Sequence, residues 1–355
     1  MSTEAKHKTL AGVRPRKRSS ISEKWINERT AQSGRTTLTI IEPQIGAVSL
    51  PSWIQTNSDL VAAHLARTGA ALFRGFTIDS VDTFREVVSC FGGEDVEYQE
   101  RSSPRTEVTH HIYTSTEHPA DQSIFPHNEN SYAHVWPRRI FFCCLSPAGE
   151  GGATPIVDVR SVYQCIDPEI RRRFEDVGVL YLRNFTEKIG MSWRKAFQTE
   201  RREEVEKIAR SAGYRLRWRD DDRLTTWRVG KASGRHPSTG QPIWFNHAAF
   251  FHISTLPPAI RETLTTQLSP DELPNNSYYG DGSPIKEDVV EQIRSCYLAH
   301  QLTFNWRLGD VLALDNMLVA HGRQPYCGSR RVLVAMKDPF QSEWLVSCKE
   351  KENEL

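Results

Sequence analysis

The feature that most constrains this chain is the pair His127 and Glu129, together with His321 far along the sequence. On an extended strand, residues two apart point to the same face, so one backbone segment can offer an imidazole nitrogen and a carboxylate oxygen to one ion. We add His321 as the third candidate ligand. Two histidines and one carboxylate, with other metal positions open, are the ligand set of non-haem Fe(II) oxygenases. A closed two-sheet β-fold would bring such distant strand ends together.

Several short segments occur around these residues in a fixed order. They are His127-Asn128-Glu129, Gly151-Gly152-Ala153-Thr154-Pro155, Asp315-Asn316, His321-Gly322-Arg323 and Gly328-Ser329-Arg330-Arg331. The set resembles the TauD/TfdA family of Fe(II)/2-oxoglutarate dioxygenases, and within it the SyrP-like branch, which is often found beside nonribosomal peptide pathways. The similarity spans roughly residues 101–339. It implies that His127, Glu129 and His321 bind Fe(II), with 2-oxoglutarate as cosubstrate and O2 as oxidant.

The resemblance also implies the fold and its domain organisation. We expect an α+β fold with a mainly β core, a double-stranded β-helix (jelly roll) with flanking helices. A long insertion, about 160–297, separates the two halves of the metal site. Residues 1–34 are predicted to be a basic, mobile tail, 35–345 a single dioxygenase domain, and 346–355 a polar C-terminal tail.

Local patterns predict individual elements. Apolar periodicity and capping residues predict helices at 58–68, 80–91, 167–177 and 199–213, and strands at 70–73, 139–145 and 179–184. The alternation in 37–41 is typical of an edge strand. Asp158 is expected to cap a helix that starts at Val159.

The residues that would hold 2-oxoglutarate are a threonine and an arginine. In the family, a threonine at about the offset of Thr154 helps to hold the cosubstrate. A guanidinium can clamp its distal carboxylate in a bidentate pair. Neighbours on a strand point to opposite faces, so only one of Arg330 and Arg331 can enter the pocket. Relatives often use the second arginine of such a pair, which favours Arg331 and leaves Arg330 as the alternative.

Substrate contacts are less well marked. Loops beside a metal centre often carry them, which makes Glu117 and Asn130 candidates. The resemblance places Asn246 near the active site, and Arg323 is predicted to support the site or touch substrate. Substrate selectivity is expected in 109–125 and 186–235, and His247 is expected to be a pocket or core histidine.

Composition excludes several classes of partner. A net charge of +1 gives no reason to expect nucleic acid or an acidic membrane. No apolar run approaches the roughly 20 residues of a spanning helix, and the N-terminus lacks a signal-peptide core. Seven irregularly spaced cysteines predict no disulfide framework. We therefore expect a cytoplasmic protein with reduced thiols.

The expected reaction is hydroxylation of an unactivated C–H bond in an amino acid or amino-acid-derived small molecule. The substrate would be free or carried on a peptidyl carrier protein, in secondary metabolism. Halogenases of this superfamily have a small residue where this chain has Glu129, which favours hydroxylation over halogenation. Desaturation or cyclisation, a zinc hydrolase using the same ligands, and a binding module without iron remain alternatives. Family members often form homodimers.

Overall fold

Two sheets form the jelly-roll core of the computed structural model, which describes residues 25–46, 48–96, 100, 102, 105–116 and 118–348. The larger sheet has the order β1 (Ile26–Ser33), β2 (Thr36–Pro43), β3 (Ala70–Phe73), β17 (Val311–Asp315), β7 (Val135–Ser146), β20 (Arg331–Gln341), β5 (Ile112–Thr114) and β4 (Glu107–Thr109). The smaller sheet has the order β16 (Leu302–Phe304), β9 (Thr154–Asp158), β18 (Val319–Arg323) and β6 (Ile124–His127). The expected fold class is confirmed.

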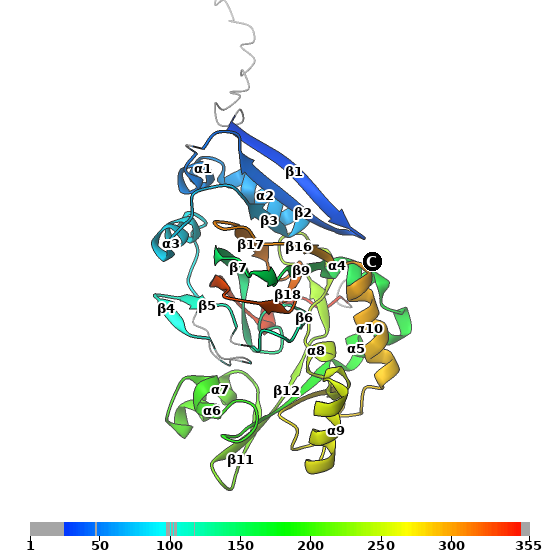
Figure 1. Cartoon of the computed structure of the whole chain (residues 1–355). Coiled ribbons are helices and arrows are strands. Elements are labelled where there is room, and N and C mark those ends of the chain that lie inside the picture. The colour runs from blue at the N-terminus through cyan, green and yellow to red at the C-terminus, as the bar shows by residue number, and fades with distance from the viewer. Residues whose placement is uncertain are drawn as a thin grey trace, which may run out of the picture.

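The N-terminal helices flank the larger sheet (Figure 1). They are α1 (Leu50–Thr56), α2 (Ser58–Thr68) and α3 (Val81–Cys90). Gly69 ends α2 in the left-handed conformation, with φ 72°, and a capping box of Ser80 and Thr83 starts α3. These features place the helices as the sequence predicts.

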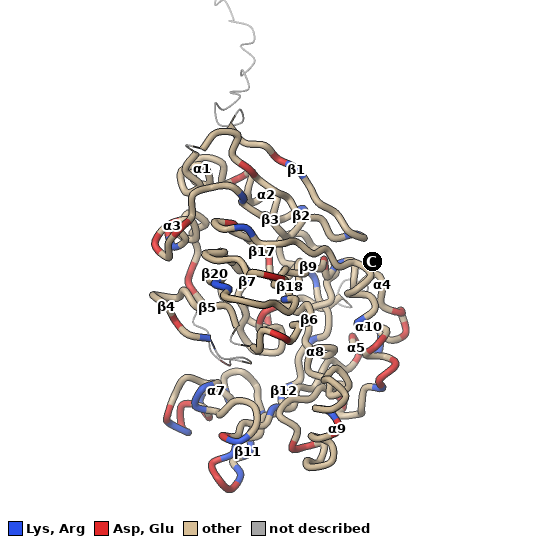
Figure 2. Tube along the Cα trace, in the orientation of Figure 1, with Lys and Arg blue, Asp and Glu red and all other residues tan. Residues whose placement is uncertain are grey.

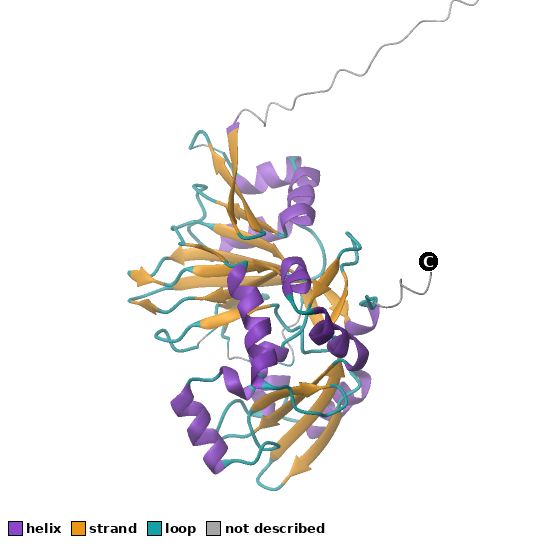
Figure 3. Ribbon diagram, turned by 90° about the vertical axis from the view of Figure 1, so that its right-hand side faces the viewer, coloured by secondary structure: helices purple, strands orange, loops and turns teal. Residues whose placement is uncertain are grey.

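The insertion between the two halves of the candidate metal site forms a further four-stranded sheet, whose strands β11 and β12 lie at the lower end of the molecule in Figure 1. Its strands have the order β11 (Arg215–Arg219), β12 (Arg223–Gly230), β10 (Val179–Phe185) and β15 (Asn275–Tyr279). Its helices are α4 (Val159–Cys165), α5 (Pro168–Val177), α6 (Trp193–Phe197), α7 (Arg202–Ser211), α8 (Ala248–Phe251), η2 (Ile253–Thr255), α9 (Pro258–Gln267) and α10 (Glu287–Ala299). Figure 3 shows this orange sheet below the jelly roll, with purple helices beside it.

Short elements complete the chain. Two strand pairs, β8 (Glu150–Gly151) with β19 (Tyr326–Cys327) and β13 (Ser233–Arg235) with β14 (Pro242–Trp244), lie outside the main sheets, and η3 (Ser342–Trp344) follows β20. Asp158 accepts a hydrogen bond from the Arg160 amide and caps α4, as expected.

None of the helices in the described part of the chain combines the length and apolar character that a membrane span requires. Basic and acidic residues are interspersed around α7 and β11 (Figure 2).

The predicted N-terminal tail extends too far along the chain. Residues 26–33 form β1, paired in antiparallel register with β2, whereas residues 1–24 lie outside the described residues. The strand predicted at 37–41 is therefore not an edge strand, because β1 covers one side of β2 and β3 the other. Likewise, Val346 bridges to Arg235, so the predicted C-terminal tail begins with a paired residue, and 349–355 are not described.

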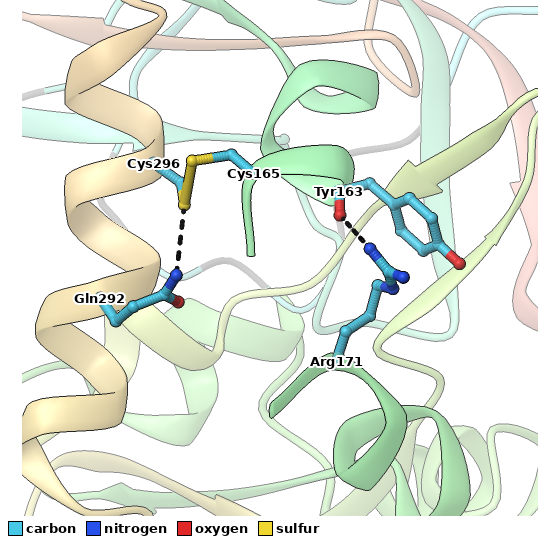
Figure 4. Close-up of a disulfide and its surroundings, with 5 residues drawn as sticks. All are labelled: Tyr163, Cys165, Arg171, Gln292 and Cys296. Atoms are coloured by element: carbon cyan, nitrogen blue, oxygen red, sulfur yellow. Dashed lines mark hydrogen bonds between the residues drawn. A yellow bond between two sulfur atoms is a disulfide. The ribbon is translucent and has the colours of Figure 1, made fainter. Parts of the chain in front are cut away.

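The expectation that all thiols are reduced is also wrong. Cys165 at the end of α4 and Cys296 in α10 form a disulfide, with their Cα atoms 5.6 Å apart (Figure 4). Gln292, one turn earlier in α10, donates a hydrogen bond to Cys296 Sγ. The two cysteines are 131 residues apart in sequence, so no local spacing signals the pair.

Candidate active site

Three side chains converge between the strands of the smaller sheet. Ligand atoms of His127, Glu129 and His321 all lie within 4.8 Å of one another. His127 ends β6, and His321 lies opposite it in β18 as its register partner. Glu129 is not on the strand, as the spacing argument assumed, but in the turn that follows it. The ligands therefore meet because two strands pair and a turn folds back.

Hydrogen bonding orients the first histidine. His127 Nδ1 lies 2.9 Å from the Phe125 carbonyl oxygen, which can only accept, so Nδ1 carries the hydrogen. The Nε2 lone pair is then available to a metal, in the arrangement common for ligating histidines. His321 Nε2 lies 3.8 Å from Glu129 Oε2, and its buried Nδ1 has no hydrogen-bond partner among the described residues. Because the His321 ring makes so few hydrogen bonds, it can act as a metal ligand.

Burial keeps both histidines neutral. It lowers the pKa of His127, and it lowers the pKa of His321 to about 3, with the adjacent His127 as the second cause. Neutral imidazole is the form that binds a metal. The site is therefore ready to bind a cation at neutral pH without first releasing protons from its histidines.

An arginine contacts the carboxylate of the triad. Arg105 Nη2 lies 2.6 Å from Glu129 Oε2, and the two side chains are only 5% and 3% exposed. The sequence marks Arg105 only as one of several loop arginines, so its role was missed. The contact restrains Oε2 of Glu129, the oxygen that also faces His321 Nε2 at 3.8 Å.

The backbone of Glu129 is held by Asn316, from the segment that follows β17. The Asn316 amide donates to the carbonyls of Glu129 and Pro137 and accepts from the Glu129 N–H at 2.7 Å. Asn316 is fully buried. Asn316 therefore fixes the turn that presents the candidate metal-binding carboxylate.

The two candidate arginines differ in burial. Arg331 starts β20 and is exposed, whereas Arg330 is half-buried and donates to Ser115 Oγ at 3.3 Å. Burial and the nearby charge of Arg323 lower the pKa of Arg330 to about 10, so it remains charged at neutral pH. Burial therefore favours Arg330, the alternative, over the expected Arg331 as the candidate clamp. Gly152 (φ 70°) makes room for it, because a Cβ there would lie 3.3 Å from Arg330 Cδ.

Thr154 starts β9 and is buried. Its Oγ1 accepts a hydrogen bond from Trp306 Nε1 at 2.9 Å, a contact that no sequence pattern signals. Because the oxygen is the acceptor in that bond, the hydroxyl hydrogen remains available for another acceptor.

Comparisons with known proteins agree with this geometry. A sequence model of the family described as "Taurine catabolism dioxygenase TauD, TfdA family" matches residues 34–336. This chain belongs to the TauD/TfdA family. The predicted family and enzyme class, a dioxygenase, are thereby confirmed.

Individual proteins are also similar to this chain. The dapdiamide synthesis protein DdaC of Enterobacter agglomerans is 42% identical over 275 residues, covering 78% of this chain and 84% of DdaC. A clavaminate synthase-like protein of Arabidopsis thaliana is 32% identical over 307 residues, covering 82% and 89% of the two chains. PvcB of Pseudomonas aeruginosa, whose structure has been solved, shares the fold, with a TM-score of 0.53, 13% identity and coverage of 93% of this chain and 97% of PvcB.

The four candidate substrate residues lie in different settings. Glu117 is outside the described residues. Asn130 is buried next to Glu129 with φ 55°, and its Oδ1 accepts from the Tyr132 hydroxyl. Asn246 lines a small cavity with His127, but its amide bonds the backbone of Ala232 and Ala248.

Arg323 and His247 support the surrounding structure. The Arg323 guanidinium donates to the carbonyls of His118, Pro119 and Gln122, so it holds a loop. His247 is buried with its ring 5.6 Å from that of His127, and Ser131 Oγ lies 2.6 Å from its Nδ1. The predicted placement of His247 in the core is confirmed.

Proposed function

We propose that this TauD/TfdA protein is an Fe(II)/2-oxoglutarate-dependent oxygenase that hydroxylates an unactivated C–H bond of an amino acid or amino-acid-derived small molecule. The observation that carries the proposal is the cluster of His127, Glu129 and His321, in which Glu129 and His321 are buried and His127 is half-buried. Two imidazoles and one carboxylate are the donors that non-haem Fe(II) oxygenases use. With Fe(II) and 2-oxoglutarate bound, the centre supplies oxidative decarboxylation by O2, which yields succinate, CO2 and an oxidised substrate.

The protein's own contribution is binding and orientation. Phe125 fixes the His127 tautomer, and Asn316 fixes the Glu129 backbone. Arg330 offers a half-buried cation to the distal carboxylate of 2-oxoglutarate, while the buried Thr154 offers its hydroxyl hydrogen. The limited exposure of these groups to bulk water strengthens each polar contact.

Glu129 supports hydroxylation over halogenation, because a carboxylate ligand occupies the position that halogenases leave to chloride. Desaturation and cyclisation use the same residues and remain alternatives. A zinc hydrolase is disfavoured because the chain belongs to a dioxygenase family. A hydrolase would also have no use for Arg330 and Thr154 as a 2-oxoglutarate site.

The names of similar proteins support a substrate from specialised metabolism. DdaC is named for dapdiamide synthesis, and PvcB is described as an Fe, α-ketoglutarate-dependent oxygenase from an isonitrile synthetic pathway. We extend this setting to the present chain, with a substrate that is free or bound to a peptidyl carrier protein. The homodimer and the cytoplasmic location also stay proposals, and the Cys165–Cys296 disulfide is unusual for that compartment.

An anaerobic titration tests this function. Fe(II) and 2-oxoglutarate are added to the metal-free protein, and the weak visible charge-transfer band of the chelate is recorded. We expect a band in the wild-type protein and none in His127→Ala. Arg330→Gln should need roughly 10- to 100-fold more 2-oxoglutarate, because a charge-assisted clamp is lost.

Arg331→Gln is the matched control and should titrate like the wild type, because Arg331 is exposed. No band in the wild-type protein, with tightly bound zinc instead, would refute the oxygenase assignment. If Arg331→Gln weakened binding and Arg330→Gln did not, the two arginines would have to exchange roles.

A further inference from the structure

His236 is a buried histidine to which the proposed function gives no role. It lies in the turn that joins β13 to β14, and its side chain is only 1% exposed. Its Nε2 lies 3.0 Å from Oδ2 of Asp315, the last residue of β17. Because His236 belongs to the insertion and Asp315 to the larger sheet, this contact joins the insertion to the jelly-roll core.

Hydrogen bonds determine which ring nitrogen of His236 carries the hydrogen. The Thr239 backbone N–H donates to Nδ1 at 3.2 Å, so Nδ1 is an acceptor. Nε2 then carries the ring hydrogen and donates it to Asp315 Oδ2. The turn that holds the ring is itself closed, because the His236 carbonyl accepts from the Gly240 N–H and its N–H donates to the Gln241 carbonyl. The Asp315 carboxylate therefore receives a donor whose position is fixed.

Asp315 organises the turn between β17 and β18. Its Oδ1 accepts from the Met317 N–H at 2.9 Å, and its carbonyl oxygen accepts from the Leu318 N–H at 3.1 Å. A carboxylate that bonds the amide two residues further on forms an Asx turn, which restrains the residue between them. That residue is Asn316. Since His236 holds the other carboxylate oxygen, it restrains the side chain that makes this turn.

The turn in its place supports the metal-binding cluster. The Asn316 side chain bonds both the N–H and the C=O of Glu129. Strand β18, which carries His321, begins directly after the turn, but it is also held by its pairing with β9 and β6. Of these two candidate ligands, Glu129 therefore depends more on the turn.

We propose that His236 is a positioning residue for the metal centre, which holds Asp315 and thereby fixes Asn316 and the direction of the Glu129 carboxylate. The inference rests on the proposed function, in which Glu129 binds the metal. It gives the insertion a part in the metal site, although none of the three candidate ligands belongs to the insertion.

Two substitutions separate the two bonds of the His236 ring. In His236→Gln, the amide nitrogen takes the place of Nε2 and can still donate to Asp315. In His236→Asn, the shorter side chain takes the place of Nδ1 and can still bond Thr239, but it does not reach Asp315. We expect His236→Asn to bind Co(II) roughly 10-fold more weakly than the wild type, as for other residues that orient metal ligands. His236→Gln should keep the wild-type affinity.

Isothermal titration of the metal-free protein measures the affinity for Co(II). The visible absorption of the bound Co(II) reports the arrangement of its ligands. We expect His236→Asn to change this spectrum, because the Glu129 carboxylate is presented differently, and His236→Gln to retain it. A loss of stability alone would leave the spectrum of the bound ion unchanged.

His252→Asn is the matched control. His252 is also buried, accepts from the Ser254 N–H at Nδ1 and donates from Nε2 to the Ile285 carbonyl. The substitution therefore removes the same kind of bond from a histidine that does not contact Asp315. We expect His252→Asn to unfold at a lower urea concentration than the wild type, and to keep the wild-type affinity for Co(II) and its spectrum.

Asp315→Asn covers the case in which His236→Asn does not fold. Its new amide nitrogen would face the Nε2 donor of His236, so it should weaken Co(II) binding as His236→Asn does. Combining Asp315→Asn with His236→Gln places an amide oxygen opposite that nitrogen. The double variant should therefore recover affinity relative to Asp315→Asn.

The outcomes separate this inference from the proposed function. Wild-type affinity and spectrum in His236→Asn or Asp315→Asn would overturn the role of His236 alone. So would equal weakening in His236→Asn and His236→Gln, or in His236→Asn and His252→Asn. A wild-type protein that binds no Co(II) would overturn the metal site, and with it both the proposed function and this inference.

Discussion

Arg105 Nη2 lies 2.6 Å from Oε2 of Glu129, so a buried cation contacts the carboxylate of the proposed metal-binding triad. Removing one partner of a buried ion pair leaves the other charge poorly compensated and costs about 3–5 kcal/mol. We expect Arg105→Gln to lower the free energy of unfolding of the metal-free protein by that amount. Co(II) should recover part of the loss, because a cation on Glu129 replaces the missing charge.

Urea denaturation with and without Co(II) measures both effects. Arg85→Gln is the control, because Arg85 forms an exposed pair with Asp82, whose loss should cost no more than about 1 kcal/mol. Equal, small losses in both variants would show that the Arg105–Glu129 contact contributes little to the site.

Asn316 determines where Glu129 is presented. In Asn316→Ala, the buried N–H and C=O of Glu129 and the C=O of Pro137 lose their bonds to the side chain. We expect a loss of stability of about 3 kcal/mol or more. Metal affinity should fall roughly 10- to 100-fold, as for other residues that orient metal ligands.

Isothermal titration with Co(II) separates positioning from general destabilisation. Asn184→Ala is the control, since the Asn184 amide also bonds buried groups, including the Leu273 carbonyl, but touches no ligand. It should lose stability and keep its metal affinity. If Asn316→Ala bound Co(II) as tightly as Asn184→Ala, Asn316 would have only a general structural role.

The Cys165–Cys296 disulfide joins α4 to α10 across a long loop of 131 residues. Such a link restricts the unfolded chain, and its removal typically costs about 2–4 kcal/mol. We expect dithiothreitol to lower the free energy of unfolding of the wild-type protein by this amount. Cys165→Ser should show the same loss without the reductant and no further response to it. A wild-type protein whose stability is the same in both conditions would show that the disulfide does not form.

Sequence patterns were sufficient to pick out the three candidate metal ligands that the fold brings together, and insufficient for what surrounds them. His127, Glu129 and His321 were identified because a short motif and a resemblance both mark them. Arg105 was missed because nothing in a loop sequence shows which arginine folds back onto a carboxylate. Such contacts depend on tertiary packing.

The choice between Arg330 and Arg331 and the extent of the N-terminal tail could not be read from the sequence. Alternation allows only one of the two arginines to face inward but does not say which, and a register shift between Arg331 and Val332 makes the start of β20 irregular. Strand β1 resembled a tail because most of its side chains are exposed. Its backbone pairing with β2, which composition does not reveal, makes it a strand.

The buried histidines predict how stability depends on pH. The pKa of His321 is lowered to about 3, whereas an unfolded histidine has a pKa of about 6.5. Between these values the unfolded chain binds a proton that the folded chain does not, so stability falls as the pH falls through this window. One such group contributes about 1.4 kcal/mol per pH unit. His127, whose pKa is also lowered, acts in the same direction.

Urea denaturation of the metal-free protein at pH 7.5 and 5.5 measures this effect. We expect His321→Gln to lose about 1 kcal/mol less stability than the wild type over this interval, because one titrating group is gone. His110→Gln, at an exposed position, should retain the wild-type dependence. If the wild type and His321→Gln lost the same stability on acidification, His321 would have to be protonated in the folded protein, and its neutral form could not be the resting state of the metal site.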